Sequence, residues 1–300
     1  MDRAYSAGRD VWLGLGLGFV GVVIFGGTLP FTRLAVAGLD PWFVTTGRAA
    51  LAGLVALGVL AATRRRLPSP AVLGRVALAS LALVGAFPAT MAIAMTSVEA
   101  SHGGVVLGVL PLATAIAGAL LGGERLPAGF WASALLGAAI VVGFALRDGV
   151  SGLAAGDAYL VLSVASAAFG YAVSGVLART MPGWEVISWA LVIALPVTIP
   201  TALVLAPADL AAVPDASWVG FAYVTLMSQY LGFFAWNAGL PLGGVARVGQ
   251  VQLLQIFVTL GIAAFLNDER VGATTWAAAA AVVAVVVAAA RARGGMRATR

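Results

Sequence analysis

The sequence predicts an all-α integral membrane protein with ten transmembrane helices arranged as two inverted five-helix repeats. Three observations support this fold class. Apolar residues make up 61% of the 300 residues, charged residues make up 10%, and the mean hydropathy is +1.02, whereas a soluble domain carries about a quarter charged residues. Long apolar runs recur along the whole chain, separated by short polar breaks. A set of residues also repeats in the second half of the chain.

The internal repeat indicates that the chain is built twice. Glu124 and Trp131 recur as Glu269 and Trp276, 145 residues further along, and an arginine follows the glutamate in both copies. Each copy ends one apolar run and opens the next, so we expect these glutamates to be hydrated markers of helix ends. Membrane proteins with two such halves are typically transporters whose halves enclose a site near the middle of the membrane.

Ten segments are long and apolar enough to cross a membrane, which takes about 20 residues. They are 11–31, 41–62, 72–95, 101–121, 129–147, 154–176, 185–205, 217–238, 246–266 and 272–290. We assign the first five to one repeat, residues 1–150, and the other five to a second repeat, residues 151–300. Because five is odd, the second repeat enters the membrane from the opposite side. The weakest boundary is Met95–Glu99, and a nine-helix alternative that fuses it would break the repeat.

Short breaks rich in Pro, Gly and charge separate these segments. Pro and Gly end helices, and short connections place neighbouring helices antiparallel. The breaks lie at 40–41, 64–70, 122–127, 147–156, 181–183, 207–214, 241–244 and 267–272.

The distribution of arginine predicts the orientation. All 17 cationic side chains are arginine. With a cytoplasmic amino terminus, 13 of the 17 fall on the cytoplasmic side, three fall on the outer side and Arg48 lies inside the second helix. The cytoplasmic set is Arg3, Arg9, Arg64, Arg65, Arg66, Arg75, Arg125, Arg179, Arg247, Arg291, Arg293, Arg297 and Arg300. Cytoplasmic loops of membrane proteins carry such an excess of cations, so we expect both termini to lie in the cytoplasm. We expect the protein itself to lie in the inner membrane of the cell.

Composition also excludes several kinds of site and partner. The chain has no cysteine and a single histidine, His102, so we expect no disulfide, no metal site and no cofactor. The net charge of +5 comes from clusters at the ends of apolar runs, which argues against nucleic acid. We expect a small-molecule substrate and the lipid bilayer as partners and a monomer as the working unit, with an oligomer as the open alternative. Gly16, Gly18 and Gly21 match a dinucleotide fingerprint but follow no strand, so packing explains them better.

Several motifs, in this order and spacing, resemble the EamA family of the drug/metabolite transporter superfamily. They are Phe25-Gly26, Gly47-Arg48, Arg64 to Pro68, Pro111 followed by Gly123 to Leu126, Ala235 to Gly239, and Asn267 to Arg270. The resemblance covers nearly the whole chain and implies a transporter of small metabolites. The Trp236-Asn237-x-Gly239 segment is similar to the amino-acid exporter branch, which implies export of amino acids, aromatic ones included, through a central cavity. Ile256 departs from the family, where a proline matching Pro111 is common, and this puts a bend of the ninth helix in doubt.

Polar and aromatic stripes on three helices are candidate substrate-binding surfaces. At 100° per residue each set falls on one face of its helix. The sets are Ser163 and Ser166 of the sixth helix with Tyr159, Gly170 and Ser174; Tyr223, Met227, Tyr230, Phe234 and Asn237 of the eighth; and Gln252 and Gln255 of the ninth with Thr259. The alternative is that these groups join helices through hydrogen bonds. On the eighth helix Thr225, Gln229 and Trp236 occupy the opposite face, and one of the two faces must pack.

Single residues add candidates for binding and bending. Arg48 is the one charge well inside an apolar run, and it either attracts a substrate carboxylate or reaches outward and binds backbone. Pro111 with Gly108, and Pro30 in the first helix, can bend their helices and free a carbonyl group. His102, near Glu99, either senses pH or meets water at a helix start.

Three functional classes remain, and a metabolite exporter fits best. We expect amino acids as the main substrates and alternating access as the mechanism. No Asp or Glu lies at mid-depth in any helix, which favours facilitative transport, with a proton-coupled drug or metabolite exporter as the alternative. A membrane enzyme would need a nucleophile, a base and an orienting group near one face, and no such set can be assembled. A receptor or scaffold has no need of an inverted repeat.

Overall fold

The computed structural model describes residues 2–122, 126–146, 155–178, 180–243 and 251–297, and every regular element in these ranges is a helix. In chain order they are α1 (Asp2–Gly26), α2 (Thr28–Val36), α3 (Pro41–Ala62), α4 (Pro70–Ser80), η1 (Leu81–Ala86), α5 (Phe87–Ala94), α6 (Ala100–Leu107), α7 (Leu110–Gly122), α8 (Ala128–Ala145), α9 (Ala155–Leu177), α10 (Gly183–Val204), α11 (Asp215–Ala222), η3 (Tyr223–Leu231), α12 (Gly232–Gly243), η4 (Gln252–Leu254), α14 (Gln255–Leu266) and α15 (Ala273–Arg297). The segments η1 and η3 are π-helical, and η4 is a 3₁₀ turn.

Each of the ten predicted segments contains helix, which confirms an all-helical fold in the described residues. Seven stretches are long and apolar enough to cross a membrane, and two shorter apolar helices follow near the carboxyl end. The seven are Trp12–Val36, Pro41–Ala62, Pro70–Ala94, Ala100–Leu121, Ala128–Ala145, Ala155–Leu177 and Gly183–Val204, and the shorter two are Gln252–Leu266 and Ala273–Ala289. The protein is therefore a multi-pass membrane protein, while the count of ten spans stays a prediction.

Local chemistry explains where the helices start. The Asp40 carboxylate accepts hydrogen bonds from the backbone N–H groups of Trp42 and Phe43, at 2.8 and 3.0 Å, and Pro41 fills the first turn of α3. An acidic cap followed by proline is a strong start signal, because it pairs free N–H groups and needs no donor at the first position. Prolines likewise precede or open α4, α8, α10 and α11.

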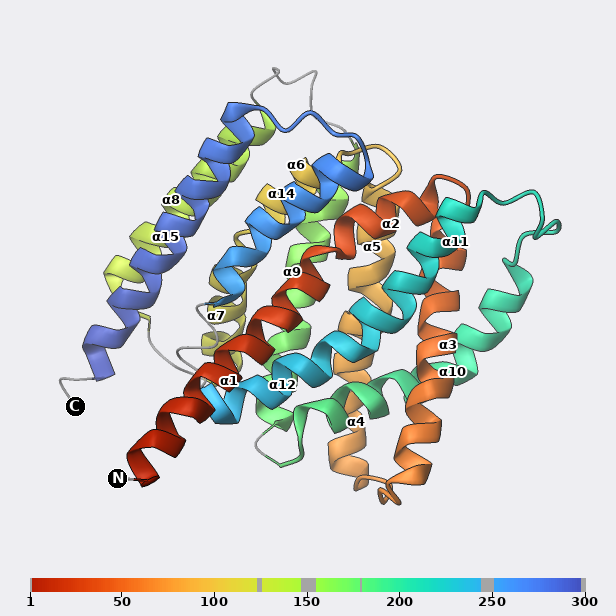
Figure 1. Cartoon of the computed structure of the whole chain (residues 1–300), viewed down its shortest axis with the longest axis horizontal. Coiled ribbons are helices and arrows are strands. Elements are labelled where there is room, and N and C mark those ends of the chain that lie inside the picture. Colours follow the sequence, from red (N-terminus) through yellow and green to blue (C-terminus); the bar gives the residue numbers. More distant parts are fainter. Residues whose placement is uncertain (1, 123–125, 147–154, 179, 244–250, 298–300) are drawn as a thin grey trace.

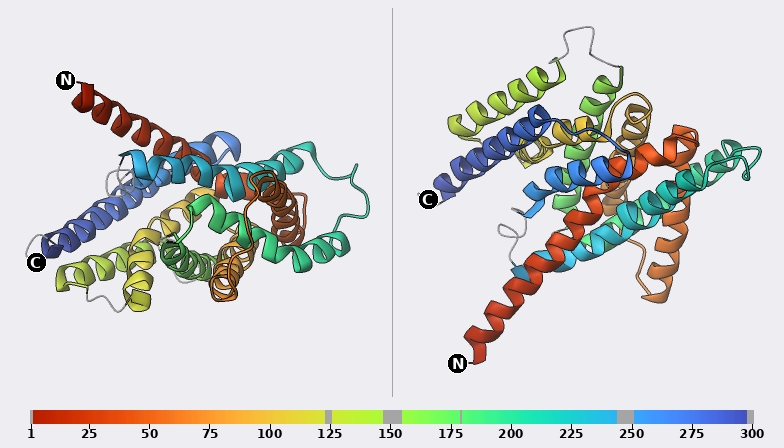
Figure 2. Two further views of the ribbon diagram at one scale, coloured as in Figure 1. Left: turned by 90° about the horizontal axis from the view of Figure 1, so that it is seen from below. Right: turned by 45° about the horizontal axis from the view of Figure 1, so that its top comes forward.

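The helices pack in pairs that follow the repeat (Figure 1). The first predicted helix (α1 and α2) packs along the eighth (α12 and α11), and the sixth (α9) packs along the third (α4, η1 and α5). Under the repeat, these two pairs are the same contact. The second and seventh helices (α3 and α10) pack against each other, as do the fifth and tenth (α8 and α15), which lie side by side at one edge of the bundle in Figure 1. Both termini lie toward the same end of the molecule (Figure 2).

Glycines allow the first and eighth helices to approach closely. A side chain at Gly21 would meet the backbone of Trp236, and one at Gly239 would meet the backbone of Gly14 and Gly18. Helices in lipid associate through such small residues, because close backbone approach maximises van der Waals contact. The glycines that match a dinucleotide fingerprint are therefore at least partly packing residues: Gly18 and Gly21 face α12.

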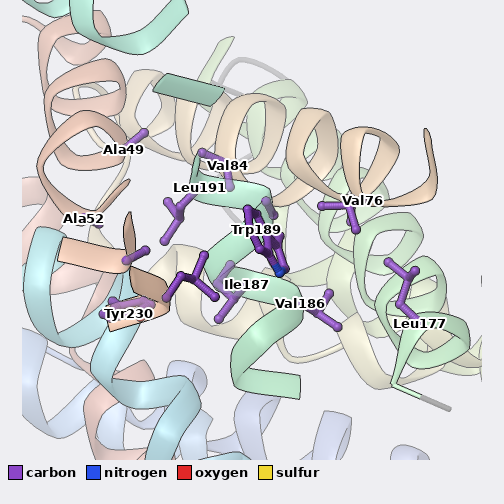
Figure 3. Close-up of a cluster of buried hydrophobic side chains, with 14 of the residues drawn as sticks. Ala49, Ala52, Val76, Val84, Leu177, Val186, Ile187, Trp189, Leu191 and Tyr230 are labelled. Carbon is purple, nitrogen blue, oxygen red and sulfur yellow. The ribbon is translucent and has the colours of Figure 1, made fainter. Parts of the chain in front are cut away.

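The largest buried cluster of apolar side chains joins α3, α4, η1, α9, α10 and η3. Figure 3 shows Tyr230 of η3 among these side chains, with Ala52 and Leu191 close by. The Tyr230 hydroxyl group shares a hydrogen bond of 2.9 Å with Ser188 Oγ of α10. This cluster fixes one wall of the bundle and holds the π-helical segment η3 against it.

Candidate central cavity

A cavity lies between the two halves of the chain. Helices from both predicted repeats contribute to its wall. The lining residues are Phe25, Thr28, Leu29, Arg48, Leu83, Phe87, Gly104, Leu107, Gly108, Leu110, Pro111, Tyr171, Ser228, Gln229, Phe233, Gln252, Leu253, Gln255, Ile256, Thr259 and Val283. The polar side chains come from α2, α3, η3, η4 and α14, and the other lining residues are aromatic, aliphatic or glycine.

Irregular helices surround this cavity at positions that correspond under the repeat. The third predicted helix turns π-helical at Leu81–Ala86 and the eighth at Tyr223–Leu231. The fourth is interrupted between Leu107 and Leu110, and the ninth carries the 3₁₀ turn Gln252–Leu254. A shift of 145 residues brings each irregularity onto its counterpart. Departures from α-helical hydrogen bonding leave backbone groups free, and in membranes they are tolerated where they line a cavity.

Two prolines create backbone acceptors at the cavity. Pro30 has no N–H group, so the Gly26 carbonyl loses its intrahelical donor, and α1 ends there. Thr259 Oγ1 of α14 donates to that carbonyl at 2.9 Å, which ties the two halves together. Pro111 in the same way removes the donor for the carbonyl of Leu107, a residue of the cavity wall. The ninth helix is broken at η4 although Ile256 stands where a proline is common, so proline is not required for that break.

Arg48 supplies the charge of the cavity. Its side chain is 2% exposed and lines the wall from α3. Arg48 Nη2 donates a long hydrogen bond of 3.4 Å to Ser228 Oγ, and Ser228 Oγ shares a hydrogen bond of 2.7 Å with Thr28 Oγ1. Arg48 Nε has no partner. A buried guanidinium with a free donor and no carboxylate partner among the described residues has the chemistry to accept an anion.

Three glutamine side chains bring amide groups to the cavity that make no hydrogen bond to a described residue. Gln229 of η3, Gln252 of η4 and Gln255 of α14 all line the cavity. None of their side chains hydrogen-bonds to a described residue. Each amide can donate and accept, so together they can orient a polar ligand without carrying charge.

Aromatic rings form the apolar part of the wall. Phe25 of α1 and Phe233 of α12 meet edge to face with centroids 5.1 Å apart, and Phe87 and Tyr171 line the cavity from α5 and α9. Such rings contribute apolar area with little loss of conformational freedom. The cavity therefore combines one cationic group, neutral amides and aromatic faces, which suits a small organic molecule with an anionic group.

Comparison with known proteins assigns the family. The model of the EamA-like transporter family matches the chain twice, over residues 12–146 and 154–290. The chain belongs to the EamA-like transporter family. This membership confirms the family resemblance, whereas the amino-acid exporter branch stays a prediction. The double match also agrees with the two halves defined by the repeat.

Two known proteins are similar to this EamA-like transporter. "Uncharacterized transporter YdeK" of Bacillus subtilis (strain 168) is 42% identical over 260 residues, which cover 87% of this chain and 90% of that protein. A solved structure titled "Crystal structure of protein" is 18% identical, covers 94% of this chain and 98% of its own, and superposes with a TM-score of 0.60. The second likeness concerns the fold alone.

The candidate residues of the eighth helix lie outside the cavity of this EamA-like transporter. Tyr223 stacks on Phe31 of α2 at 3.8 Å and donates to the Ile24 carbonyl, and Met227 is 39% exposed. Tyr230 and Phe234 pack on α10, and Asn237 lies against Gly183 at its start. The π-helical segment explains the difference, because a projection at 100° per residue fails over nine residues of wider turn. Ser228, Gln229 and Phe233 face the cavity instead.

The sixth helix places its serines away from the cavity as well. Ser163 Oγ shares a hydrogen bond of 2.7 Å with Thr90 Oγ1 of α5, so it joins two helices. Ser166 is half-buried and is not among the lining residues. Tyr171 of the same helix does line the cavity, and its isolated position in an apolar run gave little signal in the sequence.

Of the bending candidates, Gly108 and Pro111 line the cavity, and Pro30 lies buried beside it in α2. A side chain at Gly108 would meet Val282 and Ile256, and one at Gly104 would meet Thr259. The fourth helix thus needs these glycines to pack closely on the ninth and tenth.

Glu269, in the loop between α14 and α15, forms a latch, and Figure 1 shows this loop at the end of the molecule away from the termini. Its carboxylate accepts hydrogen bonds from the backbone N–H groups of Ala100 and Ser101, at 2.7 and 2.8 Å, and lies 3.5 Å from Arg33 Nε. Arg33 also donates to the Val98 carbonyl. Glu269 is 8% exposed, so the expectation of a hydrated marker is wrong for this copy: a carboxylate at a helix N-terminus is stabilised by the free N–H groups and the helix dipole. Its counterpart Glu124 lies outside the described residues.

His102 pairs with an acidic side chain of a neighbouring helix. Its Nε2 lies 2.7 Å from Asp157 Oδ1 at the start of α9, and its ring lies 5.1 Å from that of Phe144. Glu99 is exposed at the start of α6. His102 therefore links α6 to α9 instead of only meeting water, and a role in pH sensing stays a prediction.

Proposed function

We propose that the protein exports small metabolites, above all amino acids, across the inner membrane by alternating access through the central cavity. The observation that carries this proposal is the buried Arg48 guanidinium, which lines a cavity between the two halves and has no carboxylate partner in the described part of the chain. Family membership supports transport of a small molecule. The amino-acid assignment rests further on the resemblance of Trp236 to Gly239 to the exporter branch.

The proposed mechanism uses the two halves as the moving bodies. Residues 1–150 and 151–300 form inverted repeats of five spans each, and both termini lie in the cytoplasm. Rocking of one half against the other opens the cavity first to the cytoplasm and then to the outside. The shared end of the two termini and the paired packing of related helices are consistent with this arrangement.

The proposed transport is facilitative. No Asp or Glu belongs to the described lining of the cavity, and a proton-coupled exporter usually binds its proton on such a carboxylate. A proton-coupled drug or metabolite exporter is the competing function. A pH gradient that alone drives uphill efflux from proteoliposomes would favour it.

Counterflow in proteoliposomes tests the proposal. Labelled phenylalanine, or a pool of labelled amino acids, should accumulate transiently in vesicles preloaded with the unlabelled compound. Arg48→Gln should reduce this exchange about tenfold or more, because a charge-assisted hydrogen bond to the substrate is lost. Arg48→Lys keeps the charge but not the planar fork, and should retain part of the activity. Absence of exchange for every amino acid would overturn the amino-acid assignment.

A further inference from the structure

We infer that the cavity binds its substrate through the carboxylate and offers no charged partner to an amino group, so that small monocarboxylates with an uncharged, largely apolar body are substrates as well as amino acids. This inference rests on the proposed transport function but widens the substrate class beyond amino acids. It follows from the charges, the hydrogen-bond donors and the apolar residues of the described cavity wall.

The charge balance of the wall selects an anion. Arg48 is the charged side chain among the described lining residues, and no carboxylate there can neutralise it. A bound monoanion makes the site neutral. A zwitterion would add an ammonium group with no carboxylate to face, and a cation would place two like charges in one low-dielectric space. An amine alone is therefore disfavoured.

The free donors match a carboxylate. Arg48 Nε is buried without a partner, and its Nη2 makes only the 3.4 Å contact with Ser228 Oγ. A guanidinium edge binds the two oxygens of a carboxylate in parallel, which is the geometry that favours arginine over lysine at such sites. The amide of Gln229, next to Ser228 on η3, lines the same cavity and makes no hydrogen bond to a described residue, so it can serve as a further donor.

An ammonium group would find weaker partners. The amide oxygens of Gln229, Gln252 and Gln255 can accept hydrogen bonds, but they are neutral and share the cavity with the Arg48 charge. Thr28 and Thr259 are already engaged in hydrogen bonds. Most of the remaining wall is aromatic and aliphatic, with Phe25 against Phe233 and with Phe87 and Leu83 from the third helix. This part of the wall fits an aryl or alkyl body.

Three compounds with the same phenylethyl body test the inference: 3-phenylpropionate, phenylalanine and phenethylamine. Each is added at pH 8 to the purified protein in detergent, and thermal unfolding is measured, because a ligand that binds the folded state raises Tm. We expect 3-phenylpropionate to stabilise the protein at least as well as phenylalanine, and phenethylamine to have no effect. Stabilisation by phenethylamine equal to that by the acid, or loss of binding on removal of the amino group, would overturn the inference.

Variants localise the binding. Arg48→Gln should weaken binding of 3-phenylpropionate roughly tenfold or more, because the charge-assisted hydrogen bonds are lost, whereas Ser166→Ala, outside the cavity, should leave it unchanged. If Arg48→Gln does not fold, the three-compound comparison on the unaltered protein still decides. Phenylalanine counterflow distinguishes failure of the proposed amino-acid export from failure of the inferred monocarboxylate site. Binding of 3-phenylpropionate without amino-acid exchange would reject amino-acid export and keep the monocarboxylate site, and exchange restricted to compounds with an amino group would do the reverse.

Discussion

At the level of one residue, Arg48 suits the binding of an anionic ligand but lowers the stability of the folded protein in the membrane. A charged side chain in the middle of a membrane helix costs about 2.5–3.5 kcal/mol on insertion scales. The surrounding residues offset little of this cost, since Ser228 gives a single long hydrogen bond and Nε is left without a partner. A residue selected for stability alone would be apolar or fully paired. The incompletely paired guanidinium is consistent with the proposal that a ligand completes its hydrogen bonding.

Ser228→Ala should weaken substrate binding through Arg48. The Ser228 hydroxyl group links Thr28 to the guanidinium, so its loss leaves Arg48 with no hydrogen bond to a side chain and a wider range of orientations. We expect KM to rise roughly three- to tenfold, in line with the loss of one hydrogen bond of about 1 kcal/mol, with kcat little changed. Ser166→Ala is the matched control, and an equal effect in both variants would contradict this role.

The positions of Arg48, Gln252 and Gln255 in the cavity follow from features visible in the sequence, because each is a polar side chain within an apolar run. Their functions stay predictions. The sequence places Gln229 on the opposite face of the eighth helix and Ser228 on neither predicted face, and nothing in the sequence decides which face meets the cavity. That choice depends on a π-helical turn whose hydrogen bonding no periodicity of side chains reveals.

At the level of elements, close packing of the first and eighth helices predicts sites that tolerate no side chain. A Cβ atom at Gly220 of α11 would lie 2.6 Å from both Ala35 N and Phe31 O of α2, and neither backbone atom can move cheaply. Gly220→Ala should lower the free energy of unfolding by about 1–3 kcal/mol through this overlap. The measurement is thermal unfolding of the purified protein in detergent.

Gly58→Ala of α3 is the control for that substitution. No atom lies within 4 Å of a Cβ at this position, and the residue is exposed. Alanine there should leave stability unchanged or raise it by up to about 1 kcal/mol, because alanine favours helix over glycine. A Gly220→Ala protein as stable as the Gly58→Ala protein would contradict the close approach of α2 and α11.

The helices themselves could be predicted because apolar length and the Pro and Gly breaks mark them. The second helix, expected at 41–62, is found as Pro41–Ala62, with an aspartate cap and a proline that fix its start. The interruptions within helices were harder to foresee. Pro111 predicts the break in the fourth helix. The 3₁₀ turn of the ninth helix, Gln252–Leu254, forms close to Ile256, where no proline predicts it.

At the level of the whole molecule, the distribution of arginine predicts which loops face the cytoplasm. The chain contains no cysteine, so single cysteines can report exposure without a background. Leu67→Cys, in an exposed loop rich in arginine, should react with a membrane-impermeant maleimide only after cells are opened. Thr96→Cys, in the exposed turn before α6, should react in intact cells. The reverse pattern would invert the proposed orientation.

From the contacts of Glu269, we expect this latch to hold the adjoining end of the helix bundle closed. Its carboxylate joins the ends of the ninth and first helices to the start of the fourth, so these helices separate only when its hydrogen bonds to Ala100 and Ser101 break. Glu269→Gln removes the charge that the helix N-terminus and Arg33 stabilise, a loss of about 1–2 kcal/mol or roughly five- to thirtyfold in the equilibrium between closed and open forms.

Labelling of the cavity measures this shift. Leu107→Cys, on the cavity wall, should react slowly with an impermeant maleimide in intact cells and several-fold faster when Glu269→Gln is added. Asp268→Asn is the matched control, because Asp268 is exposed and its backbone φ of 53° suits asparagine. An unchanged rate with Glu269→Gln would mean that the latch does not hold this end closed. Faster labelling with both substitutions would point to a general loosening of the loop, since the two side chains differ in burial and only Glu269 contacts α6.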